Sequence, residues 1–165
     1  MTGAVDRNAR WYEDYAPGET IRAGGVTLTE SSIIDFAFRY DPQPFHIDPE
    51  FARTSIYGGL IASGWQVATA AFRMLVQAGF IGHASMGSPG IEDLRFHQPV
   101  RPGDRLLASA TVRQMRKSAS RPGLGLVTMD YRVENGRGEL CCSWHGVQLV
   151  RMRPVAQTPG QGTSL

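Results

Sequence analysis

Cysteine is scarce in this chain: only two cysteines occur among 165 residues, and they are the adjacent pair Cys141 and Cys142. Neighbouring side chains of a strand point to opposite faces, so this pair cannot readily form a disulfide. The sequence therefore excludes a disulfide-stabilised secreted scaffold. We expect both thiols to be small core or interface residues of a cytoplasmic protein.

Long apolar segments are also missing. Residues 1–10 lack the apolar core of a signal peptide. The longest apolar region, residues 60–76, is interrupted by Gly64, Gln66 and Arg73, and it falls short of the roughly 20 residues that a membrane span needs. We therefore expect no association with a membrane.

The net charge is small as well. Seventeen lysine and arginine residues face fifteen aspartate and glutamate residues, which leaves a formal charge of +2 at pH 7. The basic residues are scattered, so we expect no nucleic-acid partner. One loose basic cluster is interpreted as a solvated strand end and loop, with contact to the phosphates of a pantetheine carrier as the alternative. Its members are Arg113, Arg116, Lys117 and Arg121.

Two patterns that mark cofactor sites do not occur. No strand is followed by a G-x-G-x-x-G turn, so no dinucleotide site is expected. His83, His97 and His145 are widely spaced and lack acidic or thiol partners at metal-ligand intervals. The sequence thus predicts neither a bound metal nor another cofactor.

The length of 165 residues is enough to bury about 70% of the surface of the unfolded chain around one core. No internal repeat or linker divides the sequence. We expect one domain over residues 1–153, followed by a disordered tail over residues 154–165, where no apolar period occurs.

The first part of the chain predicts a strand and two short helices. The strand is expected near residues 20–28, weakened or bulged at Gly24-Gly25. Thr29 has the side chain of an N-cap for a helix over residues 30–40, which Asp41-Pro42 ends. A second helix is expected near residues 49–53, with Pro49 in its first position. The residues expected to face inward from the first helix are Ile33, Ile34, Phe36, Ala37 and Phe38.

The rest of the chain predicts one long helix and an antiparallel meander. The segment 63–78 has little polar face, which is typical of a buried helix, and Gly79 closes it. Strands are expected at residues 91–96, 105–116, 124–134 and 139–151, with strict apolar alternation from Val127 to Val133. Asn135-Gly136 is a hairpin signal, and a parity change at Gly146 predicts a bulge. This order indicates an α+β fold, an antiparallel sheet wrapped around a long central helix.

The chemistry is concentrated in the segment 41–48 and in the glycine-rich run that follows it. Asp41 and His46 can share one water, orient it and move its proton. Pro42 and Pro44 stiffen the intervening loop and prevent it from continuing a helix. Gly64 stands where a helix begins, and its N–H can approach a carbonyl oxygen closely because no Cβ intervenes. The combination predicts proton transfer beside a developing oxyanion.

Several separated motifs occur in the order seen in MaoC-like dehydratases. They are WYEDYAPG at 11–18, TLTE at 27–30, Asp41 with Pro44 and His46, GGLIASG at 58–64, and FHQPVRPGD at 96–104. The chain resembles this family, and within it the R-specific enoyl-CoA hydratases, over residues 10–152. The resemblance implies a hot-dog fold, a homodimer and a role in fatty acid metabolism.

The same resemblance implies an activity and its residues. The activity is that of a hydro-lyase, which adds water reversibly and syn to a trans-2-enoyl thioester of CoA or an acyl carrier, giving an (R)-3-hydroxyacyl thioester. Asp41, His46 and the Gly64 amide are the expected catalytic groups. Gln43, Ser63 and Trp65 are the expected substrate-binding residues. The family usually has asparagine at the position of Gln43, commonly histidine at Ser63, and often serine at the position of Phe72.

Two other functions remain open at this point. A hot-dog thioesterase commonly carries a catalytic carboxylate on the central helix, and no Asp or Glu occurs from residue 65 to residue 79. A non-catalytic acyl-thioester-binding subunit is the other alternative. The presence of Asp41, His46 and Gly64 together argues against it, although the fold alone does not separate these functions.

Overall fold

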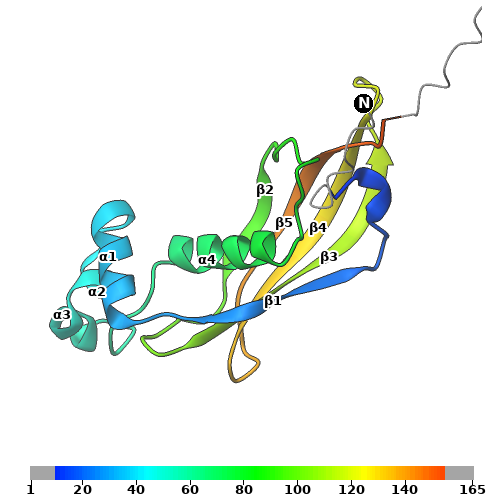
Figure 1. Cartoon of the computed structure of the whole chain (residues 1–165). Coiled ribbons are helices and arrows are strands. Elements are labelled where there is room, and N and C mark those ends of the chain that lie inside the picture. Colours follow the sequence, from blue (N-terminus) through cyan, green and yellow to red (C-terminus); the bar gives the residue numbers. More distant parts are fainter. Residues whose placement is uncertain (1–9, 155–165) are drawn as a thin grey trace, which may run out of the picture.

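The computed structural model describes residues 10–154 and contains one five-stranded antiparallel sheet (Figure 1). The order of strands across the sheet is β1-β3-β4-β5-β2. This sheet with one long helix on it is the α+β hot-dog arrangement that the sequence predicts. The expected tail lies outside the described residues, except for Pro154. The strands are β1 (Thr20–Thr27), β2 (Ile91–Phe96), β3 (Arg105–Lys117), β4 (Leu124–Asn135) and β5 (Leu140–Arg151).

The helices divide into a central helix and a group at one end of the molecule. The central helix α4 packs on the sheet, and the small helices extend away from it beyond the end of β1 (Figure 1). A short 3₁₀ helix, η1, precedes β1. The bounds are η1 (Tyr12–Asp14), α1 (Glu30–Tyr40), α2 (Pro44–Ile47), α3 (Pro49–Thr54) and α4 (Gly64–Gln77). No helix among residues 10–154 is long and apolar enough to cross a membrane.

The core lies between α4 and the concave face of the sheet. Strand β4 alternates as expected, with one face buried and the other half-buried or exposed. Each fully buried apolar side chain contributes roughly 1.5–3 kcal/mol, so this face and the facing side of α4 hold the helix on the sheet. The residues that pack together here are Val67, Ala71, Met74 and Leu75 from α4, and Val127, Met129, Tyr131 and Val133 from β4.

Local signals in the sequence are confirmed at several element ends. Thr29 caps α1, its hydroxyl accepting a hydrogen bond from the Ser32 N–H at 3.2 Å. The register of β1 against β3 shifts between Ala23 and Val26, where Gly24-Gly25 predicts a bulge. A hairpin joins β4 and β5, although its left-handed residue is Gly138 rather than Gly136.

The predicted bulge at Gly146 is wrong. The register of β4 against β5 is continuous from Leu124 to Val133 and shifts only after Val133. Buried and less buried residues alternate along β5 without interruption from Cys142 to Val150, and Gln148 occupies one of the buried positions. Its side-chain amide donates to the Tyr131 hydroxyl at 3.0 Å. Val147 therefore lies on the opposite face, and its apolar side chain caused the apparent parity change.

Three expectations about the helices also need correction. Phe38 of α1 is 65% exposed, so it does not face inward. One side of α4 is open, because Trp65 and Phe72 are 53% and 38% exposed. The segment after Asp41 is not a loop throughout, since Pro44 begins α2. Proline is favoured there because the first N–H of a helix has no partner to lose.

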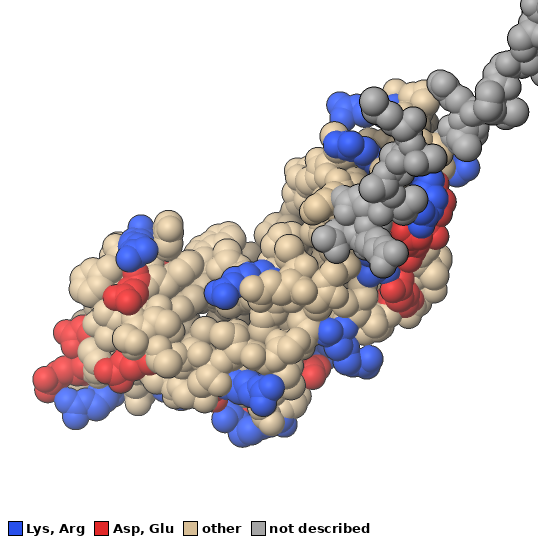
Figure 2. All heavy atoms as spheres, viewed as in Figure 1, with Lys and Arg blue, Asp and Glu red and all other residues tan. Residues whose placement is uncertain are grey.

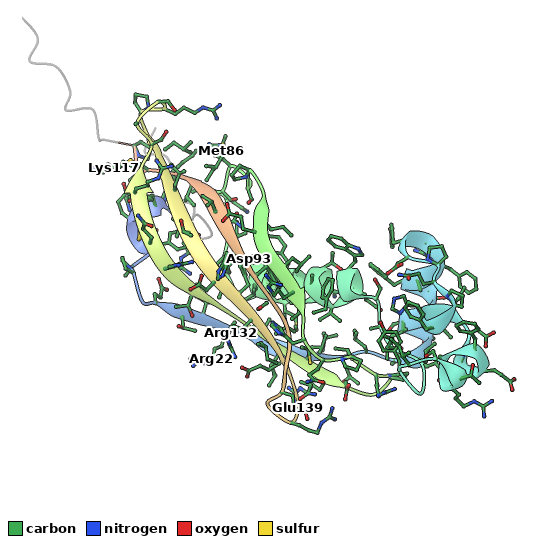
Figure 3. The ribbon with its side chains drawn as sticks, turned by 180° about the vertical axis from the view of Figure 1, so that it is seen from behind. Arg22, Met86, Asp93, Lys117, Arg132 and Glu139 are labelled. Carbon is green, nitrogen blue, oxygen red and sulfur yellow. The ribbon has the colours of Figure 1, made fainter. Side chains whose placement is uncertain are left out.

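Charged side chains are spread over the surface. On the face seen in Figure 2, lysine and arginine residues are interleaved with aspartate and glutamate along several elements. Figure 3 shows the opposite side, where Arg22 of β1 and Arg132 of β4 stand on the outer face of the sheet. Both are exposed.

Candidate active site

The predicted acid and base meet at the junction of α1, α2 and α4. Asp41 is the C-cap of α1, and His46 lies in α2. The carboxylate oxygen Oδ2 of Asp41 is 3.4 Å from Nε2 of His46. The imidazole is 4% exposed, whereas the Asp41 side chain is 18% exposed. His46 is thus the buried residue of the pair, and Asp41 is the partly exposed one.

One hydrogen bond decides which ring nitrogen of His46 faces Asp41. Nδ1 lies 2.8 Å from the carbonyl oxygen of Ile61. A carbonyl oxygen can only accept, so Nδ1 carries the proton and donates it. In the neutral ring, Nε2 then presents a lone pair towards Asp41. With the ring neutral, two acceptors face each other and a donor such as water can bridge them; with the ring protonated, Nε2 itself is the donor.

The Asp41 carboxylate is held on both oxygens. The Ser63 hydroxyl donates to Oδ2 at 2.6 Å, and the Gln43 side-chain amide donates to Oδ1 at 2.7 Å. Burial alone raises the pKa of this carboxyl. The hydrogen bonds from Ser63 and Gln43, together with the positive charge that His46 carries when it is protonated, outweigh burial and leave the pKa of Asp41 below its ordinary value. Asp41 is thus an ionised acceptor at neutral pH.

Gly64 begins α4 directly beside this pair. Because it is the first helical residue, its N–H has no partner within the helix. An added Cβ would lie only 2.5 Å from Cζ of Phe96 on β2, so the aromatic ring closes over the glycine. Only glycine leaves this space free without moving Phe96.

A cavity of about 380 Å³ joins these groups. Asp41, His46 and Gly64 line it together with Gln43 and Trp65. Trp65 meets Phe96 edge to face, with the ring centroids 6.3 Å apart. Ser63 is fully buried behind the cavity wall. The structure therefore brings all six predicted site residues to one place.

Sequence reasoning missed several residues of this cavity. The motif at residues 96–104 supplies Phe96, His97 and Gln98 to the cavity. Its occurrence in the family order was the one sequence signal that could have assigned these residues to the site. Nothing in the sequence indicated that Ile61 holds His46, because a backbone carbonyl leaves no compositional trace. The additional lining residues include Phe45, Tyr57, Phe96, His97, Gln98 and Cys141.

Within residues 10–154, no three histidine, cysteine, aspartate or glutamate side chains gather in a way that could hold a metal ion. Both thiols are buried and free. Burial raises the pKa of Cys142 to about 12, the nearby Cys141 adding to the shift. A thiol of this kind is a poor nucleophile at neutral pH. Burial also raises the pKa of Cys141, the thiol that lines the cavity. Asp41 and His46 are the acid and base of the cavity lining that lie within 3.4 Å of each other.

Comparison with known proteins identifies the family and the fold of this chain. The family model for the MaoC like domain matches residues 13–134. The (R)-specific enoyl-CoA hydratase of Rhodospirillum rubrum is 31% identical over 118 residues, covering 66% of this chain and 74% of that protein. The crystal structure of a MaoC-like dehydratase from Rhodospirillum rubrum is 35% identical, with a TM-score of 0.80, and covers 89% of this chain and 100% of that one.

A third comparison concerns the fold alone. The R-hydratase PhaJ1 from Pseudomonas aeruginosa has a TM-score of 0.70 at 21% identity, covering 93% of this chain and 96% of that chain. The family model spans most of the chain, and the matched segment contains α1, α2, α4 and strands β1 to β3 with most of β4. The chain belongs to the MaoC-like domain family.

Proposed function

We propose that this protein is a hydro-lyase that adds water reversibly to a trans-2-enoyl thioester of CoA or an acyl carrier. The observation that carries the proposal is the pair of Asp41 Oδ2 and His46 Nε2, 3.4 Å apart beside the first N–H of α4. Membership of the MaoC-like family and likeness to an R-specific hydratase support it. The two unpaired, buried cysteines fit an enzyme of the reducing cytoplasm.

The proposed reaction uses these three groups together. A water bound between Asp41 and His46 gives one proton to the pair as its oxygen forms a bond to C3 of the enoyl group. The Gly64 N–H donates to the thioester oxygen, on which charge develops, and the pair returns one proton to C2. Asp41 Oδ2 and His46 Nε2 are only 3.4 Å apart, so we assign the two proton transfers to the pair as a unit. Oxygen and proton arrive from one side, which gives syn addition and an (R)-3-hydroxyacyl thioester.

A homodimer is part of the proposal. Strand β2 is an edge of the sheet, and an unpaired edge is normally covered. Ile91 and Phe96 of β2 are 52% and 50% exposed, and Phe96 contacts the exposed Trp65 of α4. The exposed rings of Phe96 and Trp65 beside the cavity, together with the open edge of β2, suit a second copy of the chain, which buries both strand edges.

The test is hydration of a trans-2-enoyl-CoA of about four to eight carbons, followed by loss of the conjugated absorbance. We expect Asp41→Asn and His46→Gln each to lower kcat by about 10² or more, because both act on one water. The chain offers a matched control: Asp130 and His145 form a second carboxylate–imidazole pair on the outer face of the sheet, with Oδ1 and Nδ1 2.6 Å apart. Asp130→Asn and His145→Gln should leave kcat unchanged.

Product analysis completes the test. The expected product is the (R) alcohol, and reaction in deuterated water should show deuterium added on the same face as oxygen. An (S) product or anti addition contradicts the proposed geometry. Release of free CoA without hydration identifies a thioesterase instead, and wild-type kcat in the Asp41 and His46 variants removes both residues from the mechanism.

A further inference from the structure

Ser63 lies between Asp41 and the start of α4, and it takes no direct part in the proposed reaction. Its side chain is fully buried. The hydroxyl donates to Oδ2 of Asp41 at 2.6 Å and accepts from the Trp65 N–H at 3.2 Å. The oxygen that Ser63 holds is the one that lies 3.4 Å from His46. One hydroxyl group therefore joins the carboxylate to the first turn of α4.

The backbone around Ser63 is fixed on both sides. The Ala62 N–H donates to the carbonyl oxygen of Val100 at 2.8 Å, and the Ile61 carbonyl accepts from the His46 ring at 2.8 Å. Gly64 follows directly. The four residues Ile61–Gly64 thus orient the imidazole, the carboxylate and the oxyanion donor in one short segment.

We propose that Ser63 is a positioning residue, which fixes the Asp41 carboxylate relative to His46 and to the Gly64 N–H. This inference rests on the proposed function. It assigns Ser63 a different task from substrate binding, because the hydroxyl is already used at both its donor and its acceptor side and is hidden from the cavity. Gln43 completes the arrangement by holding the other oxygen of Asp41 at 2.7 Å.

Three variants separate the tasks of this hydroxyl. Ser63→Ala removes both hydrogen bonds. Ser63→Gly removes the donor to Asp41 but remains a good N-cap, since glycine caps nearly as well as serine. Ser63→Thr retains a hydroxyl group that can make both bonds. The matched control is Thr29→Ala, which removes a cap bond of the same 3.2 Å length at α1 without touching Asp41.

Two readouts are used, one of which needs no substrate. The pKa of the Asp41 carboxyl is measured by NMR, and kcat and KM for an enoyl-CoA are measured against pH. Loss of the donor should raise the pKa of Asp41 and the acid limb of kcat/KM by about one pH unit in Ser63→Ala and Ser63→Gly. We expect kcat to fall about tenfold or more, since small displacements of a reacting group are costly, while KM stays within about twofold.

The controls decide between positioning and capping. Ser63→Thr should restore the wild-type pKa and kcat, and Thr29→Ala should lower only the Tm. A lower Tm in Ser63→Ala with Asp41 titrating as in the wild type overturns the inference, as does a rise in KM alone, which returns Ser63 to substrate binding. If the wild type hydrates no enoyl thioester, the proposed function fails, while the NMR titration still decides whether Ser63 positions Asp41.

Discussion

Substitution of Gly64 by alanine tests the proposed oxyanion site most directly. The new Cβ would lie 2.5–2.6 Å from three ring atoms of Phe96. Ordinary carbon–carbon contact needs about 3.5 Å, so the ring has to move by about 1 Å or the helix start has to shift. Either change alters the approach of a thioester oxygen to the Gly64 N–H. Loss of one such donor costs roughly 10² to 10³ in rate, and we expect a fall in kcat/KM of that size.

The stability of this variant should change little. Phe96 is half-exposed, so its ring can turn outwards, and alanine is favoured over glycine in a helix by up to about 1 kcal/mol. The Tm is therefore expected within a few degrees of the wild-type value. The assay is hydration of a trans-2-enoyl-CoA, with thermal unfolding measured on the same samples.

A matched glycine substitution provides the control. A Cβ on Gly136 would meet nothing closer than 3.9 Å, so Gly136→Ala should keep wild-type kcat/KM. Adding Phe96→Ala to Gly64→Ala separates two causes: recovery of activity assigns the loss to the displaced ring, and no recovery assigns it to the blocked N–H. A folded Gly64→Ala variant with wild-type kcat/KM would refute the reasoning.

Three further predictions concern pH, the core and metals. Because the pKa of Asp41 is lowered in the fold, its ionised form stabilises the protein above the ordinary carboxyl pKa, and this contribution is lost as pH falls through the lowered pKa. The free energy of unfolding of Asp41→Asn should accordingly depend less steeply on pH below about pH 4, and an unchanged slope would contradict the assigned hydrogen bonds. Tyr131→Phe leaves the buried Gln148 amide without its acceptor and should cost about 1–3 kcal/mol in urea unfolding; a neutral effect would show that Gln148 finds another partner. Hydratase activity should survive exhaustive chelation, and a strict requirement for added divalent metal would overturn the proposed mechanism.

Assembly is checked by sedimentation. The exposed β2 edge and its apolar neighbours predict a dimer at micromolar concentration. A monodisperse, active monomer would contradict the proposed interface.

Much of the fold could be predicted from the sequence because its signals are local. Each of these signals acts over a few residues. Examples are the N-cap Thr29 before an apolar helical period, the alternation from Val127 to Val133, and Asn135-Gly136 between two strands. Helix capping, strand alternation and turn formation depend on the nearby backbone, so they can be predicted without knowing the tertiary structure. The residue types of the site were visible for the same reason, since Asp41 and His46 lie within one short segment.

Other features depended on contacts that the sequence does not display. Gly146 seemed to mark a bulge, but it lies under the Tyr131 ring, and Gln148 keeps the strand in phase by bonding to the same tyrosine. Phe38 satisfied the helical period of α1 but faces outwards, because this helix lies beyond the end of the sheet and has only a narrow buried side. Periodicity identifies an apolar face, whereas the packing partners decide how wide that face is.

The sequence by itself determined the order of elements, the local ends of the helices and the kinds of chemical group available for proton transfer. Only the tertiary structure decided that the Ile61 carbonyl orients His46, and that Ser63, 22 residues from Asp41, holds its carboxylate. The physical reason is that hydrogen bonds between distant residues depend on how α1, α2 and the start of α4 pack together. No spacing or composition in the chain encodes that approach locally.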